Sequence, residues 1–161
     1  MSVYTRLGRG EIEIQRLTKT AKIPTQGSEY AAGYDLYADN YSGNKSKDWT
    51  LQINPGECVK IGTGVAVAIP EFYFGGVYPR SGLATKNGLA PANKVGVIDA
   101  DYRGEIIVAL YNHSNVPQIV KQGDRIAQLI IQPFVSFEWT EVDELPETDR
   151  GDGGFGSTGK N

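Results

Sequence analysis

Glycine and proline recur along the chain and divide it into short segments. The 161 residues include 20 Gly and 8 Pro, and between them apolar and polar residues alternate over short runs. A period of two is typical of a strand with one buried face. The pattern predicts an all-β fold of antiparallel strands, as a sandwich, barrel or jelly roll, because too few helices are expected to connect parallel strands.

The alternating segments define the predicted strands. They are Glu11–Leu17, Tyr34–Ala38, Trp49–Ile53, Val59–Ile69, Phe72–Tyr78, Glu105–Asn112, Arg125–Ile131 and Phe134–Trp139. Asn54–Gly56 and Gln122–Asp124 are predicted turns. One short helix is predicted from Ser81, whose hydroxyl can cap the first turn, to a stop at Gly88.

The length suits one domain with its own hydrophobic core. We predict that residues 1–145 form this β domain. After Leu145 the apolar alternation stops, so residues 146–161, rich in glycine, are predicted to form a flexible C-terminal arm. Ser42–Asp48 is polar and is expected to be a loop, which is where a protein partner would be sought.

Charge and cysteine content exclude several functions. The net charge of −3 provides no basic field for DNA or RNA. Cys58 is the only cysteine, which excludes an intrachain disulfide and a cysteine metal site. No secretion signal or bilayer-spanning run of about 20 apolar residues is present. We expect no membrane partner and a cytoplasmic location, or a soluble nuclear or host-cell one for a eukaryotic or viral source.

Arg80, Ser81 and Gly82 bring phosphate-binding chemistry to the start of the predicted helix. A guanidinium can bind phosphate through two hydrogen bonds, a hydroxyl can donate, and glycine lets the backbone approach closely. Helix N-termini also attract anions. The alternative is an ordinary capped helix with a surface arginine, and this segment by itself favours the alternative.

Asp99 is the candidate general base. It continues the odd-numbered face of Val95 and Val97, at the end of an apolar strand. General-base catalysis typically contributes about 100- to 10,000-fold. The alternative is that Asp99 and Asp101 shape the turn into Arg103, which is the commoner role of Asp in such a segment.

Asp35 and Gln128 are further candidates. Asp35 lies between apolar neighbours and can orient a metal-bound water or an arginine, with a purely structural pair as the alternative. Gln128 falls in a predicted strand, where a solvent-facing polar residue would be unremarkable. His113 is the only histidine, so neither a histidine metal site nor a Ser-His-Asp triad is supported.

Taken in order, the segments around Asp35, Arg80, Asp99, Gln128 and Phe155 resemble the five ordered motifs of the trimeric dUTPases. The resemblance implies a distorted jelly-roll subunit of the β-clip type. It implies a homotrimer whose three active sites lie at subunit boundaries, each closed by the arm of another subunit. The implied reaction hydrolyses dUTP to dUMP and pyrophosphate, which limits uracil incorporation into DNA and supplies dUMP.

The same resemblance implies roles for individual residues. Asp99 would deprotonate the water that attacks the α-phosphorus. The substrate-binding residues would be Arg80, Ser81, Gly82 and Gln128 on the phosphate chain, Arg150, Ser157 and Thr158 at its far end, Asn93 with the backbone near Gly96 and Ile98 at the uracil edge, Tyr102 under the deoxyribose where it leaves no room for a 2′-hydroxyl, and Phe155 with Gly156 over the uracil. Mg²⁺ would be held mainly by triphosphate oxygens, with no direct protein ligand and Asp35 at most in its outer shell.

Two alternatives have the same fold. A dCTP deaminase shares much of the segment around Asp99, but its base-attacking glutamate would align with Ala109. A nucleotide-binding regulatory protein could retain the fold without turnover, although the intact Asp99 and the arm argue against it.

Overall fold

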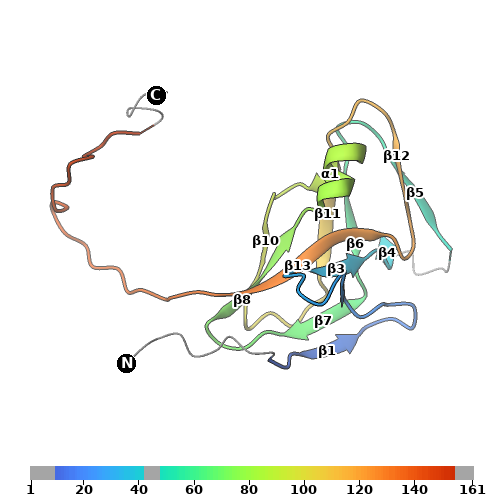
Figure 1. The fold of residues 1–161 in the computed structure, drawn as a ribbon, viewed down its shortest axis with the longest axis horizontal. Coiled ribbons are helices and arrows are strands. Elements are labelled where there is room, and N and C mark those ends of the chain that lie inside the picture. Colours follow the sequence, from blue (N-terminus) through green and yellow to red (C-terminus); the bar gives the residue numbers. More distant parts are fainter. Residues whose placement is uncertain (1–9, 42–47, 155–161) are drawn as a thin grey trace.

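The computed structural model describes residues 10–41 and 48–154. Its strands are β1 (Glu13–Arg16), β2 (Thr25–Gln26), β3 (Tyr34–Tyr37), β4 (Asn40–Tyr41), β5 (Thr50–Ile53), β6 (Cys58–Gly62), β7 (Val65–Ala68), β8 (Tyr73–Tyr78), β9 (Leu89–Pro91), β10 (Gly96–Ile98), β11 (Ile107–Asn112), β12 (Gln118–Lys121) and β13 (Arg125–Pro133). Every pair is antiparallel. Sheets with the orders β10-β8-β13-β3-β2 and β4-β6-β11-β9 form the body, with β1-β7 and β12-β5 as smaller pairs (Figure 1).

One hydrophobic core joins the two larger sheets. Leu36 and Ile126 enter it from one sheet and Ile61, Val108 and Leu110 from the other, and all five are at most 1% exposed. Burying a side chain of this size stabilises the fold by about 1.5–3 kcal/mol. The prediction of an all-β, distorted jelly roll of the β-clip type with one short helix is confirmed.

The predicted strand Val59–Ile69 is wrong as a single element. The chain forms β6 and β7 with a break at Thr63 and Gly64, where Gly64 has a φ of 68°. A left-handed residue interrupts strand geometry, and glycine adopts it without a Cβ penalty. The short strands β2, β4, β9 and β12 were not predicted, because segments of two to four residues are too short to show a period.

The predicted strand Phe134–Trp139 is also wrong. β13 ends at Pro133, and the following residues extend away from the body without strand pairing in the described structure (Figure 1). Phe137 is 78% exposed and Trp139 is 97% exposed. The alternation is present, but only Phe134 stays on the body, where its N–H donates to the Phe72 carbonyl oxygen at 2.9 Å; residues 135–139 pair with no described strand. The division of the chain at residue 145 stays a prediction.

The short helix is confirmed as α1 (Ser81–Asn87), and Gly88 ends it in the left-handed conformation with a φ of 67°. The predicted cap is wrong. Arg80 occupies the N-cap position without a side-chain cap bond, so Ser81 lies inside the first turn. Nowhere in the two described stretches is there a helix long and apolar enough to span a membrane.

Candidate functional site

Strand β13 brings together three segments that are distant in the sequence. Its Gln128 lies opposite Asp35 of β3 on one side and opposite Tyr78 of β8 on the other. Pro79 and Arg80 directly follow Tyr78, so this register places Asp35, Arg80 and Gln128 at one end of the same sheet. We call Asp35, Arg80, Arg125 and Gln128 the arginine cluster.

Asp35 pairs with both arginines of the cluster. Arg80 Nε donates to its Oδ1 at 2.7 Å, and Arg125 Nη1 donates to its Oδ2 at 3.0 Å. Asp35 is only 12% exposed, whereas Arg80 is 26% and Arg125 is 51% exposed. One carboxylate therefore offsets only one of the two guanidinium charges, and the remaining positive charge lies at the surface, where a polyanion can bind it.

Gln128 fixes the segment that carries Arg80. Its Nε2 donates to the carbonyl oxygen of Pro79 at 2.9 Å. Gly33 makes this position possible, because a Cβ on Gly33 would overlap Gln128 Oε1. The backbone before Arg80 is thus held by a side chain from a neighbouring strand. The fold thus brings the candidates Asp35, Arg80 and Gln128 together.

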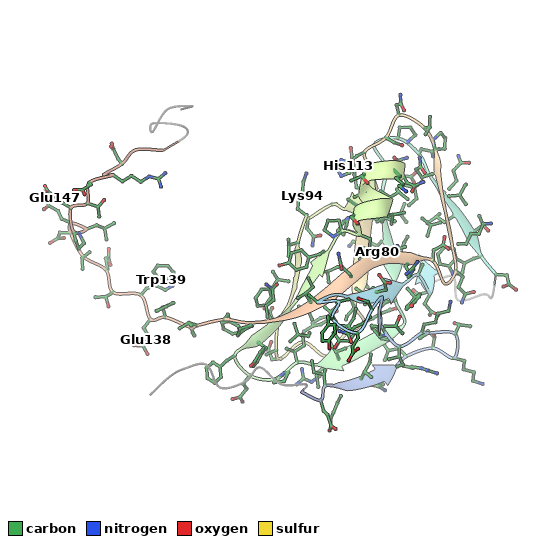
Figure 2. All side chains as sticks on the ribbon, viewed as in Figure 1. Arg80, Lys94, His113, Glu138, Trp139 and Glu147 are labelled. Atoms are coloured by element: carbon green, nitrogen blue, oxygen red, sulfur yellow. The ribbon has the colours of Figure 1, made fainter. Side chains whose placement is uncertain are left out.

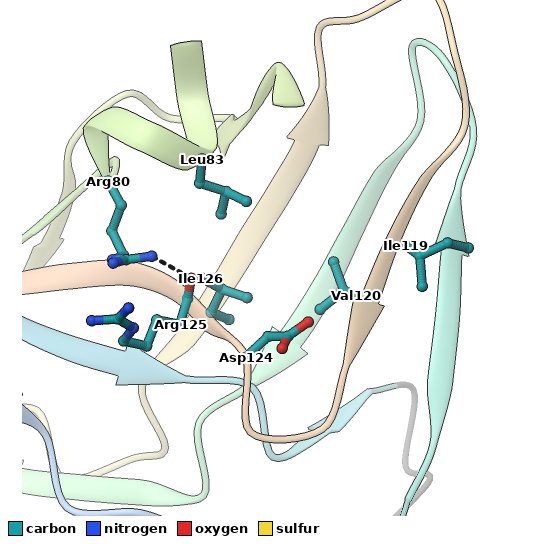
Figure 3. A pocket seen from close by; sticks show the side chains of 7 residues that line it. All are labelled: Arg80, Leu83, Ile119, Val120, Asp124, Arg125 and Ile126. Carbon is teal, nitrogen blue, oxygen red and sulfur yellow. Dashed lines mark hydrogen bonds between the residues drawn. The ribbon is translucent and has the colours of Figure 1, made fainter. Parts of the chain in front are cut away.

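A cavity of about 260 Å³ opens beside the arginine cluster (Figure 3). Arg80 and Arg125 line one side, and Leu83 from α1 lies above them. Ile119 and Asp124 contribute from the β12 side. Its lining is partly apolar, with the two guanidinium groups at its charged side.

A second cavity of about 230 Å³ lies at the loop between β10 and β11. It is lined by Val97, Ile98, Asp99, Tyr102, Glu105 and Ile107. Residues 99–105, called here the Asp99 loop, are shaped by local hydrogen bonds. The Tyr102 N–H donates to the Asp99 carbonyl oxygen at 3.1 Å, and Arg103 Nη1 donates to the Ala100 carbonyl oxygen at 2.6 Å. Both Asp99 and Tyr102 are exposed.

Asn93 lies close to this region, in the turn between β9 and β10. It is exposed, and a Cβ on Gly96 would come within 3.0 Å of its Nδ2 and 3.3 Å of Val77 Cβ. Gly96 therefore allows Asn93 to approach the backbone of β10. Lys94 in the same turn has a φ of 65°, which bends the chain sharply before β10.

Arg150, the candidate of the C-terminal arm that the structure describes, lines neither cavity. Arg150 Nε donates to the Gly153 carbonyl oxygen at 2.8 Å, on the extended segment that also carries Trp139 and Glu147 (Figure 2). The residues predicted to reach the phosphates and cover the base, Phe155, Gly156, Ser157 and Thr158, lie outside the described residues. So does most of the predicted loop, residues 42–47.

Among residues 10–41 and 48–154, no group of three or more His, Cys, Asp or Glu side chains could hold an ion. Both oxygens of Asp35 accept hydrogen bonds from arginine. The Asp35 carboxylate is thus already engaged by the two arginines of the cluster.

The sequence alone did not identify Arg125 or Glu105. Arg125 begins a predicted strand directly after the predicted turn Gln122–Asp124, a place where a charged residue is ordinary. Glu105 begins a predicted strand, and its partners lie 65 and 41 residues away along the chain. No local pattern indicates either contact, since both depend on the pairing of distant segments.

The fold and the two cavities define a class: a jelly-roll protein with a cationic cluster and a separate carboxylate-bearing cavity. The dUTPase family model matches residues 19–159. A Deoxyuridine 5'-triphosphate nucleotidohydrolase of Desulfitobacterium hafniense (strain DSM 10664 / DCB-2) is 50% identical over 150 residues, covering 92% of this chain and 95% of that protein. The chain therefore belongs to the dUTPase family.

Two solved structures agree with this assignment. A point mutant of the dUTPase of Staphylococcus bacteriophage 80alpha with dUpNHpp is similar at a TM-score of 0.82 and 28% identity, covering 94% of this chain and 99% of that one. A point mutant of the dUTPase from phage phi11 of S. aureus, described with a structural Mg(II) ion, has a TM-score of 0.70 and 27% identity, covering 84% and 98%.

Proposed function

We propose that this chain hydrolyses dUTP to dUMP and pyrophosphate, as a dUTP diphosphatase. The observation that carries the proposal is the cavity of about 230 Å³ in which Asp99 and Tyr102 lie together, in a chain of the dUTPase family. This arrangement provides a carboxylate beside a space of nucleoside size. The arginine cluster provides the positive charge that a triphosphate requires.

The phosphate chain is bound by Arg80, Ser81, Gly82 and Gln128 in this proposal. Asp35 and Gln128 hold the Arg80 segment in place before substrate arrives. Phosphoryl transfer depends mostly on positioning and charge stabilisation, so pre-positioned donors lower the barrier directly. Ser81 retains its hydroxyl for the substrate, since it makes no cap bond in α1.

Asp99 acts as the general base. Its carboxylate takes a proton from water, and the resulting hydroxide attacks the α-phosphorus as the bond to the bridging oxygen of pyrophosphate breaks. The exposed position of Asp99 at the cavity supports this role, because water and substrate can both reach it. Asp101, which does not line this cavity, is left to shape the turn.

Selectivity for the base and the sugar is assigned to the second cavity, at the Asp99 loop, called here the nucleoside cavity. Asn93, with the backbone of Gly96 and Ile98, reads the uracil edge, and the Tyr102 ring packs under the deoxyribose. Phe155 of the arm stacks over the base, with Gly156 beside it. Arg150, Ser157 and Thr158 reach the far end of the phosphate chain. Closure of the arm excludes water and strengthens the charge interactions in the site.

The active unit is a homotrimer with sites at subunit boundaries. Two features of the single chain support this proposal. The cavity beside the arginine cluster and the cavity at Asp99 have no lining residue in common. Residues 134–152 are exposed and extend away from the body. Both features are accounted for if one subunit supplies the phosphate side, a second the nucleoside side and another the arm.

Mg²⁺ is the proposed cofactor, bound with the triphosphate. When bound, it neutralises charge on the phosphate oxygens. Asp35 would reach it only through a water, because arginines occupy both carboxylate oxygens. The structural Mg(II) described for the phage phi11 dUTPase mutant supports a role for this ion in the family.

The test is pyrophosphate release in the presence of Mg²⁺ from dUTP, dCTP, dTTP and UTP, with ammonia release measured on dCTP. We expect release from dUTP alone. Equal release from all of them would refute the selectivity assigned to Asn93 and Tyr102. Ammonia release from dCTP would identify a deaminase, although Ala109 lacks the carboxylate such chemistry needs. No reaction with any substrate would favour a regulatory nucleotide-binding role.

A further inference from the structure

The Glu105 carboxylate joins the Asp99 loop to the body of the subunit. Its Oε1 accepts a hydrogen bond from Asn40 Nδ2 at 2.7 Å and another from the Gly64 N–H at 2.7 Å. The space for this contact is made by Gly62, because a Cβ there would overlap both Glu105 Oε1 and the Asn40 amide. Glu105 also lines the cavity that contains Asp99 and Tyr102.

The same residue holds Tyr102 through its backbone. Tyr102 Oη donates to the Glu105 carbonyl oxygen at 3.0 Å. Gly104 permits this fold of the ring over the loop, because a Cβ on Gly104 would overlap the Tyr102 hydroxyl. The position of the Tyr102 hydroxyl therefore follows the position of the Glu105 backbone.

The other hydrogen bonds of the Asp99 loop are local. Tyr102 N–H and Arg103 bond to carbonyl oxygens within three residues of themselves. Such bonds give the loop its shape but do not fix its place on the body. The Glu105 side chain does so, since its partners lie on the break between β6 and β7 and on β4. Ile106, directly after the loop, is fixed there too, by its buried side chain, by backbone bonds with Thr63 and Val65 and by the Thr63 hydroxyl. Within the loop itself, the Glu105 side chain makes the contact with the body.

We propose that Glu105 is a positioning residue for sugar selectivity, and this inference rests on the proposed function of the nucleoside cavity. Its carboxylate fixes the end of the Asp99 loop and, through the Tyr102 hydroxyl, the plane of the ring that meets the sugar. A ring that shifts by a fraction of an ångström leaves room for a 2′-hydroxyl. Glu105 itself touches no reacting atom.

The experiment measures binding of the imido analogue dUpNHpp and its ribose counterpart UpNHpp by calorimetry with Mg²⁺. Glu105→Ala is expected to reduce the preference for the deoxy analogue by roughly tenfold. Glu105→Gln should retain the preference, because the amide Oε1 can still accept both hydrogen bonds. The same pair of variants, assayed with dUTP and UTP, should change the kcat/KM ratio in parallel.

Glu57→Ala is the matched control. Glu57 Oε2 accepts a hydrogen bond from the Asn54 N–H at 2.7 Å and from Asn54 Nδ2 at 3.1 Å, so it also clamps a turn with one carboxylate oxygen. It lines neither cavity. We expect lower thermal stability in this variant with an unchanged preference between the analogues. A lower preference in the control would mean that general loosening explains the effect, which would overturn the proposal.

Asn40→Ala tests the positioning role of Glu105 if Glu105→Ala does not fold. It removes one of the two donors and should reduce the preference about threefold, leaving the Gly64 bond intact. An unchanged preference in every folded variant at Glu105 and Asn40 would refute the proposal while leaving dUTP hydrolysis untouched. If the wild type binds dUpNHpp selectively but does not hydrolyse dUTP, the catalytic proposal fails and the positioning proposal stands.

Discussion

The arginine cluster and the Asp99 loop are built in opposite ways. Asp35, Arg80, Arg125 and Gln128 come from three segments and meet through strand register and long-range hydrogen bonds. The Asp99 loop is one continuous stretch, shaped mainly by bonds within itself and attached at its end through Glu105. The proposed phosphate-binding cluster therefore depends on the pairing of the whole sheet, whereas the proposed general base depends on a local turn.

Because of this difference, substitutions in the two regions should affect catalysis and folding stability differently. Removing a charge from the arginine cluster leaves arginines without their partner in a partly buried place, so folding and binding should change together. Removing the carboxylate of Asp99, which is exposed, should change the reaction and leave the fold alone. Variants on the two sides can thus establish whether the site is divided as described.

The largest effect is expected for Asp99→Asn. The amide has nearly the same shape but cannot accept the proton, so kcat for dUTP should fall by about 100- to 10,000-fold with an unchanged melting temperature. Asp101→Asn is the control, since Asp101 is exposed in the same loop and does not line the cavity. If both variants lose activity equally, the loop as a whole is required and Asp99 is not the base.

Deleting residues 150–161 should have the next largest effect. The segment before it makes no strand pairing in the described structure, so the truncated protein should remain folded. We expect kcat to fall roughly 100-fold because the site stays open to water. The measurement is steady-state kinetics beside a melting curve. Unchanged kinetics would contradict the role of the arm as a lid.

Asp35→Asn tests the arginine cluster. The change weakens the bonds to Arg80 and Arg125 and leaves two guanidinium groups without a carboxylate. The Arg125 bond is half-exposed and worth little, so the loss is expected to come mainly from Arg80, at about 1–2 kcal/mol in urea unfolding. The kcat/KM for dUTP should fall roughly tenfold as Arg80 loses its orientation.

The control for this change is Glu57→Ala, which removes the accepting carboxylate altogether. Glu57 also accepts two hydrogen bonds, but both donors belong to Asn54 and no arginine is involved. It should lose some stability and retain kcat/KM. A parallel loss of activity in both variants would indicate that Asp35 acts through general stability. The arginine cluster would then have no special part in binding phosphate.

Much of the fold was predictable because the alternation of apolar residues and the glycine and proline turn signals are local features of the sequence. β3, β8, β11 and most of β13 follow their alternating segments, and α1 ends at Gly88 as expected. The break at Gly64 was missed because the odd-numbered apolar residues Val59, Ile61, Val65, Val67 and Ile69 keep a period of two across it. The alternation of Phe134–Trp139 was recognised correctly, but a strand also needs a partner edge, which sequence pattern does not supply.

The candidate site was predictable in its residue types and less so in its contacts. Asp35 and Arg80 could be named from their segments and the family resemblance. That Arg125 shares the same carboxylate depends on the register of β13 against β3, which a shift of one residue would destroy. Glu105 and Asn40 likewise meet only because β6 pairs with β4 on one side and with β11, which follows Glu105, on the other.

The smallest effect on activity is expected for Gly64→Ala, which tests how firmly the Asp99 loop is attached to the body of the subunit. Gly64 has a φ of 68°, and a Cβ would lie 2.6 Å from Asp39 Oδ2. Strain and crowding should cost about 2 kcal/mol and lower the melting temperature by roughly 4–8 °C. Gly27→Ala, where a Cβ meets nothing within 4 Å, should be neutral. The Gly64 N–H also donates to Glu105. Weaker dUpNHpp binding together with the lower melting temperature would therefore show that the Asp99 loop depends on its contact with the body. Unchanged binding would show that the loop keeps its position without that contact.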